Sequence, residues 1–431
     1  MNVLSARTLC ACVLVFLWVA PVAYADDSAM PPLTLEQAIG AALKSNPELA
    51  TFAFRLRAQD ARVRQGSLRP APEISVEVEN ALGSGELKNF DAAETTFALS
   101  QVVELGDKRD ARITAARAGR GLIEAERELR QLDVLADVAR RFITVAGRQE
   151  QLKLARTGTS ITESTVKAAQ RRVDAARSPH AELDRARIAL DRSRLEERRA
   201  AMELQTARGQ LAASWGESQP VLNGQRLGEI RADLFAMPPV GDFAALDAQV
   251  ANNPELLLFA SQARLREAEL RLAATLRRPD LSLSVGARRL EATHDQALVA
   301  SFSIPLFAAR RSDSFIAEAQ SQRDLVDADR RIAELRARAT LYELHAQLSQ
   351  AVLEANTLRG EMLPRVEEAM RETQYAYDRG RYSYLELVDA QREFLAVQSL
   401  LIAASIDAHS LRAEIERLTR APTFTGPLNP K

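Results

Sequence analysis

Two hydrophobic periodicities alternate along the chain, and each of them occurs twice. Over residues 107–213 and 311–418, apolar residues recur every three or four positions, which predicts long helices. Over residues 74–81 and 281–287, apolar and polar residues alternate one by one, which predicts strands with one apolar and one polar face. The pattern indicates a mainly helical chain with a small amount of β structure.

A second alternating stretch follows each of these strands, near residues 96–100 and 298–304. Each pair predicts a β-hairpin, at about residues 73–104 and about residues 280–305, so the chain would hold four short strands. The periodicity alone also allows an alternative, in which two ordinary hairpins pack against the helices.

The two halves of the chain are copies of one another. Asn46-Pro47-Glu48-Leu49 recurs as Asn253-Pro254-Glu255-Leu256, and the strand that follows Pro72 recurs after Pro279 at the same offset. Residues 380–391 also have a diverged copy at residues 176–186. Several matches in the same order predict an internal duplication.

Breaks in the helical pattern divide each half further. We expect the turn of the first helical hairpin at Arg156-Thr157-Gly158-Thr159-Ser160 and that of the second at Arg359-Gly360-Glu361-Met362-Leu363-Pro364. Residues 380–391 then fall inside the last helix. Helices of about fifty residues would each be roughly 75 Å long, a length that suits long antiparallel hairpins.

The N-terminal residues resemble a secretory signal. A basic Arg7 precedes an apolar run, and Ala23-Tyr24-Ala25 is a small-x-small cleavage site. No later segment has the uninterrupted apolar length of a transmembrane helix. The predicted organisation is a signal peptide at 1–25, a first repeat at 26–213, a linker at 214–241, a second repeat at 242–418 and a C-terminal tail at 419–431.

Composition narrows the range of functions. Charged residues make up 27% of the chain but the net charge is −1, so a nucleic-acid partner has no electrostatic support. Both cysteines, Cys10 and Cys12, lie in the predicted signal, which leaves no disulfide or thiolate site. The four histidines, His180, His294, His345 and His409, have no zinc-site spacing. We therefore expect no metal site, no cofactor and no enzymatic activity.

The strands impose a constraint if they cross a membrane. Four strands cannot close a barrel, and open sheet edges are not tolerated in lipid. Two copies of the chain would give eight strands, whose interior side chains fill, whereas three copies would give twelve strands and leave a lumen. The chain would then have to form a cyclic oligomer.

These features together resemble the TolC family of outer-membrane efflux proteins, over essentially the whole chain after the signal. Glu104-Leu105-Gly106-Asp107-Lys108-Arg109 is similar to a segment of the heavy-metal (CzcC-like) branch, with Asp107 in place of a second glycine. Ser303-Ile304-Pro305-Leu306-Phe307 is similar to the strand exit of the same branch.

The resemblance implies a mainly α-helical fold with a small transmembrane β part: a homotrimer with a 12-stranded barrel and a periplasmic tunnel of long helical hairpins. It implies the outer membrane of a Gram-negative bacterium, with most of the chain in the periplasm and the barrel in contact with outer-membrane lipid. Its partners would be a periplasmic adaptor (membrane fusion) protein and an inner-membrane RND-type pump, and the exported substrate would be divalent heavy-metal cations.

The same resemblance implies roles for the predicted hairpin tips. The expected adaptor contacts are Arg156, Thr157, Gly158, Thr159, Arg359, Gly360 and Pro364. Glu361, Glu367 and Glu368 would form an acidic ring that selects or gates cations. Solvated charge near a helix end is the alternative reading of these glutamates.

Other functions stay open at this point. The channel could serve drug efflux or type I secretion, because neither needs a different fold. A soluble periplasmic helical adaptor or scaffold would share the long helices but would lack the duplicated strand pairs. A secreted enzyme is disfavoured, since no motif fixes a catalytic constellation.

Overall fold

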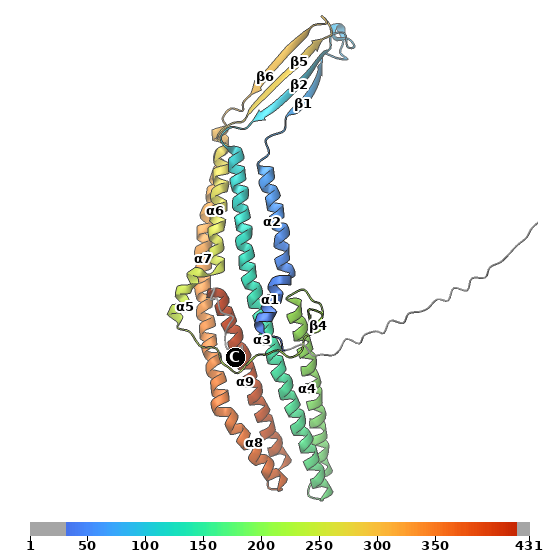
Figure 1. Cartoon of the computed structure of the whole chain (residues 1–431), viewed down its shortest axis with the longest axis vertical. Coiled ribbons are helices and arrows are strands. Elements are labelled where there is room, and N and C mark those ends of the chain that lie inside the picture. Colours follow the sequence, from blue (N-terminus) through green and yellow to red (C-terminus); the bar gives the residue numbers. More distant parts are fainter. Residues whose placement is uncertain (1–31, 420–431) are drawn as a thin grey trace, which may run out of the picture.

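The computed structural model describes residues 32–419, so the predicted signal peptide and nearly all of the predicted tail lie outside the described residues. The described chain forms a long rod of helices with a β-sheet at one end (Figure 1). Hairpins of helices form the opposite end. The mainly helical fold with a small β part is therefore confirmed.

Long helices run along the rod and shorter ones flank them. The helical elements are α1 (Leu35–Ser45), α2 (Pro47–Gly66), α3 (Lys108–Asp174), α4 (His180–Ala213), α5 (Phe243–Gln249), α6 (Pro254–Thr275), α7 (Ala308–Thr357), α8 (Leu363–Asp378), α9 (Tyr384–Thr419) and the short turns η1 (Gly85–Leu87), η2 (Val250–Asn252) and η3 (Leu358–Met362). Near the sheet, α3 lies between α2 and α6; farther away it pairs with α4, and α8 pairs with α9 (Figure 1).

One antiparallel sheet contains all the predicted strands. Its order is β1 (Glu73–Glu79), β2 (Glu94–Val103), β5 (Leu281–Leu290) and β6 (Gln296–Ser303). β1–β2 and β5–β6 are the two hairpins that the alternating pattern predicts. The pairing of β2 with β5 joins the two repeats into one sheet. β3 (Val221–Leu222) and β4 (Gln225–Arg226) form a separate small ribbon in the linker.

The repeated Asn-Pro-Glu-Leu motif lies where helices meet end to end. The Asn46 side chain accepts hydrogen bonds from the backbone N–H of Glu48 (2.9 Å) and Leu49 (3.1 Å), and so caps α2. Its Nδ2 donates to the carbonyl of Ser214 (2.8 Å), just beyond α4. Asn253 caps α6 in the same way. Asn46 therefore satisfies backbone groups both at the start of α2 and at the end of α4.

The linker crosses the helices near the middle of the rod. His409 Nε2 on α9 donates to the carbonyl of Leu234 (3.1 Å), and His345 Nε2 on α7 donates to that of Gly241 (2.9 Å). Burial lowers the pKa of His409, so this imidazole is neutral in the folded chain. Two of the four histidines thus hold the linker in place.

The helix α9 supplies much of the core. Its residues Ile402 and Ala413 pack with α3, while Ala408 and Ile415 pack with α7. Among the described helices, α9 alone is long and apolar enough to cross a membrane, which the sequence pattern did not indicate. Of that apolar window, 44% is buried inside the fold.

The predicted turn of the first hairpin is wrong. Arg156, Thr157, Gly158 and Thr159 lie inside α3, which runs unbroken from Lys108 to Asp174. The threonines do not break the helix because Thr157 and Thr159 bond the carbonyls four residues earlier, at 3.1 and 3.2 Å. Gly158 is buried within this helix, where a Cβ would lie 3.5 Å from Leu395 at ordinary van der Waals distance.

The predicted turn of the second hairpin is wrong as well. Arg359, Gly360 and Glu361 lie in η3, a π-helical segment, and Pro364 lies in the first turn of α8. A π segment absorbs the irregular sequence without reversing the chain. Arg359 Nη1 instead donates to the linker carbonyl of Phe235 (2.8 Å).

Candidate channel wall and hairpin tips

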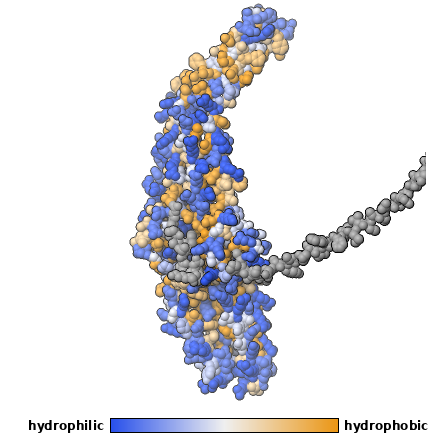
Figure 2. All heavy atoms as spheres, viewed as in Figure 1, coloured by the Kyte–Doolittle hydropathy of each residue, from blue (hydrophilic) through white to orange (hydrophobic). Residues whose placement is uncertain are grey.

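One face of the sheet is apolar and exposed. The cross-strand register puts Ile74, Leu99 and Val285 in one row, and Val76, Phe97 and Leu298 contribute to the next. Ile74 is 80% exposed and Leu298 88% exposed. The others are also exposed, and hydrophobic residues gather over the sheet in Figure 2. A continuous exposed apolar face fits a lipid-facing surface.

The opposite face is polar and built largely from small side chains. Ser100, Ser284 and Ser301 form one row, beside Glu73. Gly286 in the next row has no room for a side chain, since a Cβ would lie 2.4 Å from the carbonyl oxygen of Phe97. Such a face suits contact with water.

Both edges of the sheet are unpaired. Within the described chain, β1 pairs only with β2 and β6 only with β5. A lipid-facing sheet cannot leave these backbone groups unsatisfied. In lipid, these edges would need further strands, which the described chain does not supply.

The connection from sheet to helices contains two residues with positive φ. Gly106 has φ +81, and a Cβ there would lie 2.5 Å from the Cδ of Arg278. Asp107, the residue that replaces a second glycine, has φ 58 and begins α3 without a side-chain cap. Phe307 holds the same position before α7, with φ 60. The glycine-rich pattern of this segment thus reflects left-handed backbone.

The true turn of the first hairpin follows α3. The chain reverses over residues 175–179, with Ala176 in the left-handed conformation (φ 53) and Pro179 immediately before α4. This turn begins sixteen residues beyond Thr159, or about 24 Å along the helix. The proline at 179 was the signal that could have located it.

The true turn of the second hairpin is the duplicated segment itself. Gly380 has φ +75, and Ser383 and Glu386 form reciprocal hydrogen bonds at the start of α9. This arrangement is a capping box, a signature that residues 380–391 display in the sequence. In the first repeat, Ala176 occupies the position that corresponds to Gly380 and also has a positive φ. The segment is therefore a hairpin tip and not a helix interior.

A cluster near the tips joins the two hairpins. Tyr377 of α8 is fully buried, and its hydroxyl donates to Glu182 Oε1 of α4 at 2.6 Å. Arg172 of α3 donates to the Tyr377 carbonyl (3.0 Å) and to Ser178 Oγ (3.0 Å). Its guanidinium carbon lies 4.4 Å from the centre of the tyrosine ring. We call Arg172, Glu182 and Tyr377 the tip cluster.

Burial is the main cause of an altered pKa in this cluster. Burial and the hydrogen bond to Glu182 raise the pKa of Tyr377 well above its ordinary value, so its hydroxyl remains a donor. Sequence reasoning did not find these residues, because no local motif shows that positions 182 and 377 meet.

The acidic residues predicted to gate the channel lie away from this end. Glu361, Glu367 and Glu368 are exposed. Glu368 lies ten residues before the end of α8, about 15 Å from the turn. It pairs with Arg371 on the same helix. The predicted position at the mouth is therefore wrong, and the structure does not bring the three carboxylates together with the tip cluster.

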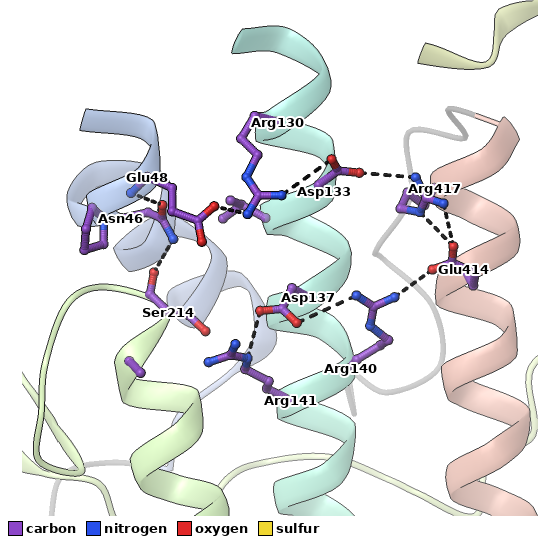
Figure 3. A pocket seen from close by; sticks show the side chains of 13 residues that line it. Asn46, Glu48, Arg130, Asp133, Asp137, Arg140, Arg141, Ser214, Glu414 and Arg417 are labelled. Atoms are coloured by element: carbon purple, nitrogen blue, oxygen red, sulfur yellow. Dashed lines mark hydrogen bonds and ion pairs between the residues drawn. The ribbon is translucent and has the colours of Figure 1, made fainter. Parts of the chain in front are cut away.

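A network of ion pairs lines a cavity of about 640 Å³ at mid-rod (Figure 3). Acidic and basic side chains alternate in it from α2 through α3 to α9. In order along the network they are Glu48, Arg130, Asp133, Arg417, Glu414, Arg140, Asp137 and Arg141. Each carboxylate has an arginine partner, so the network ties the three helices together.

No group of three or more histidine, cysteine or carboxylate side chains that could hold a metal ion occurs among residues 32–419. His180 begins α4, and His294 lies between β5 and β6, so neither is on the helices whose histidines contact the linker.

Comparison with known proteins finds relatives of this chain. Residues 38–217 match the model of the family described as outer membrane efflux protein. The matched segment therefore resembles outer membrane efflux proteins. The predicted resemblance to TolC-like channels is confirmed.

Similar proteins extend the match along the chain. The chain is 29% identical to the cobalt-zinc-cadmium resistance protein CzcC of Cupriavidus metallidurans, over 90% of each chain. It is 27% identical to the nickel and cobalt resistance protein CnrC of the same organism, over 74% of this chain and 75% of that one. The outer-membrane channel OprN has the same fold, with a TM-score of 0.70 at 17% identity, over 91% of this chain and 93% of that chain.

Proposed function

We propose that the protein is the outer-membrane channel of a tripartite efflux system and exports divalent heavy-metal cations. The observation that carries the channel assignment is the four-stranded sheet, which has an exposed apolar face, a polar face and two unpaired edges. Such a sheet becomes stable in lipid when copies of the chain close it into a barrel.

Three copies would supply twelve strands and a water-filled lumen, which favours a homotrimer. The polar face of each sheet then lines the lumen, and the helices continue the tube into the periplasm. The channel itself needs no catalytic group, because a passive conduit moves what an energised partner delivers.

Metal export is supported by the relatives. Both curated relatives are metal-resistance proteins, and one matches over 90% of the chain. A drug-efflux or type I secretion channel is the alternative, because the fold serves either use.

The hairpin turns are the proposed contacts for a periplasmic adaptor that links the channel to an inner-membrane pump. The turns at 175–179 and 379–383 replace the predicted tips, since they are the ends of the rod opposite the sheet. An adaptor bound at these turns would lie close to the tip cluster, which holds the α3–α4 hairpin against α8 and α9. We propose that breaking the cluster lets the hairpins separate and opens the mouth.

The experiment is growth of a deletion strain over a range of zinc, cobalt, cadmium and copper, and on a panel of dyes and antibiotics. Loss of metal tolerance alone, restored by the wild-type gene, supports metal export. Sensitivity to organic compounds with normal metal tolerance would refute the substrate and leave a drug-efflux channel. Recovery of the protein outside the outer-membrane fraction would refute the channel.

A further inference from the structure

The polar face of the sheet carries almost all of its charge. Within the four strands, Glu73, Glu77 and Glu79 of β1 and Glu94 of β2 point to this side, as the register requires. Arg288 of β5 is the one cation among the described strand residues of that face. Four carboxylates and one guanidinium leave a net charge of −3 per chain.

Arg288 lies across the sheet instead of projecting from it. Its Nε donates to Thr96 Oγ1 at 2.9 Å and its Nη1 to Glu94 Oε2 at 2.7 Å, both on β2. Its Nη2 lies 3.0 Å from Glu79 Oε2 on β1. One guanidinium therefore uses its planar fork to hold residues of two other strands.

The two carboxylates that it holds are direct neighbours. Glu79 and Glu94 are opposite each other in the register, at the end of the sheet away from the helices. Like charges directly opposite repel, and the guanidinium between them offsets this repulsion. Without Arg288, two carboxylates and a hydroxyl oxygen would face one space, a donor set that suits divalent cations.

The remaining carboxylates of the face are different. Among the described residues, no ion pair involves Glu73 or Glu77. These two lie four residues apart on β1, about 13 Å along the strand. They attract cations without forming a pair that could hold one. Conduction requires this combination, because a site that binds too tightly stops flow.

We propose that Arg288 prevents the channel wall from trapping the divalent cations that it exports. It occupies the space between Glu79 and Glu94 that a bound cation would otherwise take, while Glu73 and Glu77 keep the path attractive to cations. The inference rests on the proposed function, since it requires the polar face to line the path.

The test is the current through the purified full-length channel in a planar lipid bilayer, with Co²⁺ as the probe. Arg288→Gln should be blocked by Co²⁺ at a concentration about tenfold lower than the wild type, because a vacant carboxylate pair binds the ion. Arg288→Gln combined with Glu94→Gln should return to wild-type behaviour. Arg289→Gln is the matched control, since Arg289 lies on the opposite face and pairs with Glu291 at 2.6 Å.

A separate variant distinguishes failure of the proposed channel wall from failure of the role proposed for Arg288. Glu77→Gln should lower the preference for cations over anions if the polar face lines the path. If neither Glu77→Gln nor Arg288→Gln changes permeation, the wall assignment in the proposed function is wrong. If Glu77→Gln acts as expected but Arg288→Gln shows unchanged Co²⁺ block, the role of Arg288 alone is refuted.

A cysteine variant covers the case in which Arg288→Gln does not form channels. The sequence has no cysteine after Cys12, so Arg288→Cys is a unique thiol in the described chain. If Co²⁺ blocks Arg288→Cys strongly before reaction with a cationic thiol reagent and weakly after it, the result supports the proposal. Equal block in both states would overturn it.

Discussion

Tyr377→Phe tests whether the tip cluster holds the hairpins together. The change removes one hydroxyl, while the phenyl ring keeps its packing against Ala168 and Leu387. A hydrogen bond to a charged group contributes about 1.5–3 kcal/mol. Losing it should shift the balance toward separated hairpins by roughly tenfold or more per chain. If three copies open together, the combined factor is about a thousand.

The assay is single-channel conductance of the purified protein in planar bilayers. Tyr377→Phe should increase the fraction of time spent in the high-conductance state. Glu182→Gln should have a smaller effect, because the amide oxygen still accepts the hydrogen bond. Tyr375→Phe is the control: Tyr375 lies two residues away on α8, is 55% exposed and stacks with Arg379.

The tip cluster does not hold the hairpins together if Tyr377→Phe conducts like the wild type while its fold, followed by circular dichroism, is unchanged. An equal increase in Tyr375→Phe would also refute it, since the effect would then come from a general loosening of α8.

Further predictions concern stability, measured by thermal or denaturant unfolding of the purified protein. Asn46→Ala should destabilise by about 1–3 kcal/mol, because it removes a cap and the bond to the Ser214 carbonyl; Asn46→Asp, which keeps the cap, should lose less, and equal losses would argue against the double role. Gly106→Ala should destabilise by at least about 1 kcal/mol at its positive φ, whereas Asp107→Gly should stabilise slightly; a loss in Asp107→Gly would contradict the strain. The pKa of His409 in the folded chain lies below its unfolded value of about 6.5. The stability that the buried neutral imidazole contributes is therefore complete above about pH 6.5 and is lost as the pH falls through the folded pKa. The nearby Asp233 carboxylate opposes this shift, and replacing His409 with Gln should remove that part of the pH dependence.

The sheet could be predicted from the sequence because apolar and polar residues alternate along much of its strands. Alternation over 74–81 and 281–287 defines both the strands and their apolar side. The pairing of β2 with β5 was not predicted from this pattern. It depends on two segments almost two hundred residues apart, and no local signal reports such a contact.

The hairpin turns were misplaced for a local reason. Weak helix formers such as Thr157 and Gly158 suggested a break, but packing in the middle of a long hairpin overrides propensity. Ala176, in contrast, adopts a left-handed conformation without the glycine that usually marks it. Gly380, Ser383 and Glu386 did carry the signature of a turn and a helix start, and the duplicated copy supported it.

The tip cluster and the Arg288 contacts could not be predicted. Each joins side chains that are close only after distant helices or strands have been placed, such as Glu182 with Tyr377 and Arg288 with Glu79. The sequence shows which residues are charged, and the register decides which of them share a face.

The most direct test of the channel wall is cysteine labelling along β5 in outer membranes. Single cysteines at Ser282, Ser284 and Arg288 should react with a membrane-impermeant charged thiol reagent. Cysteines at Leu283 and Val285, on the apolar face, should stay unreactive because lipid covers them. Alternation of reactivity with a period of two residues supports a barrel wall with a water-filled lumen, and uniform reactivity along the strand would contradict it.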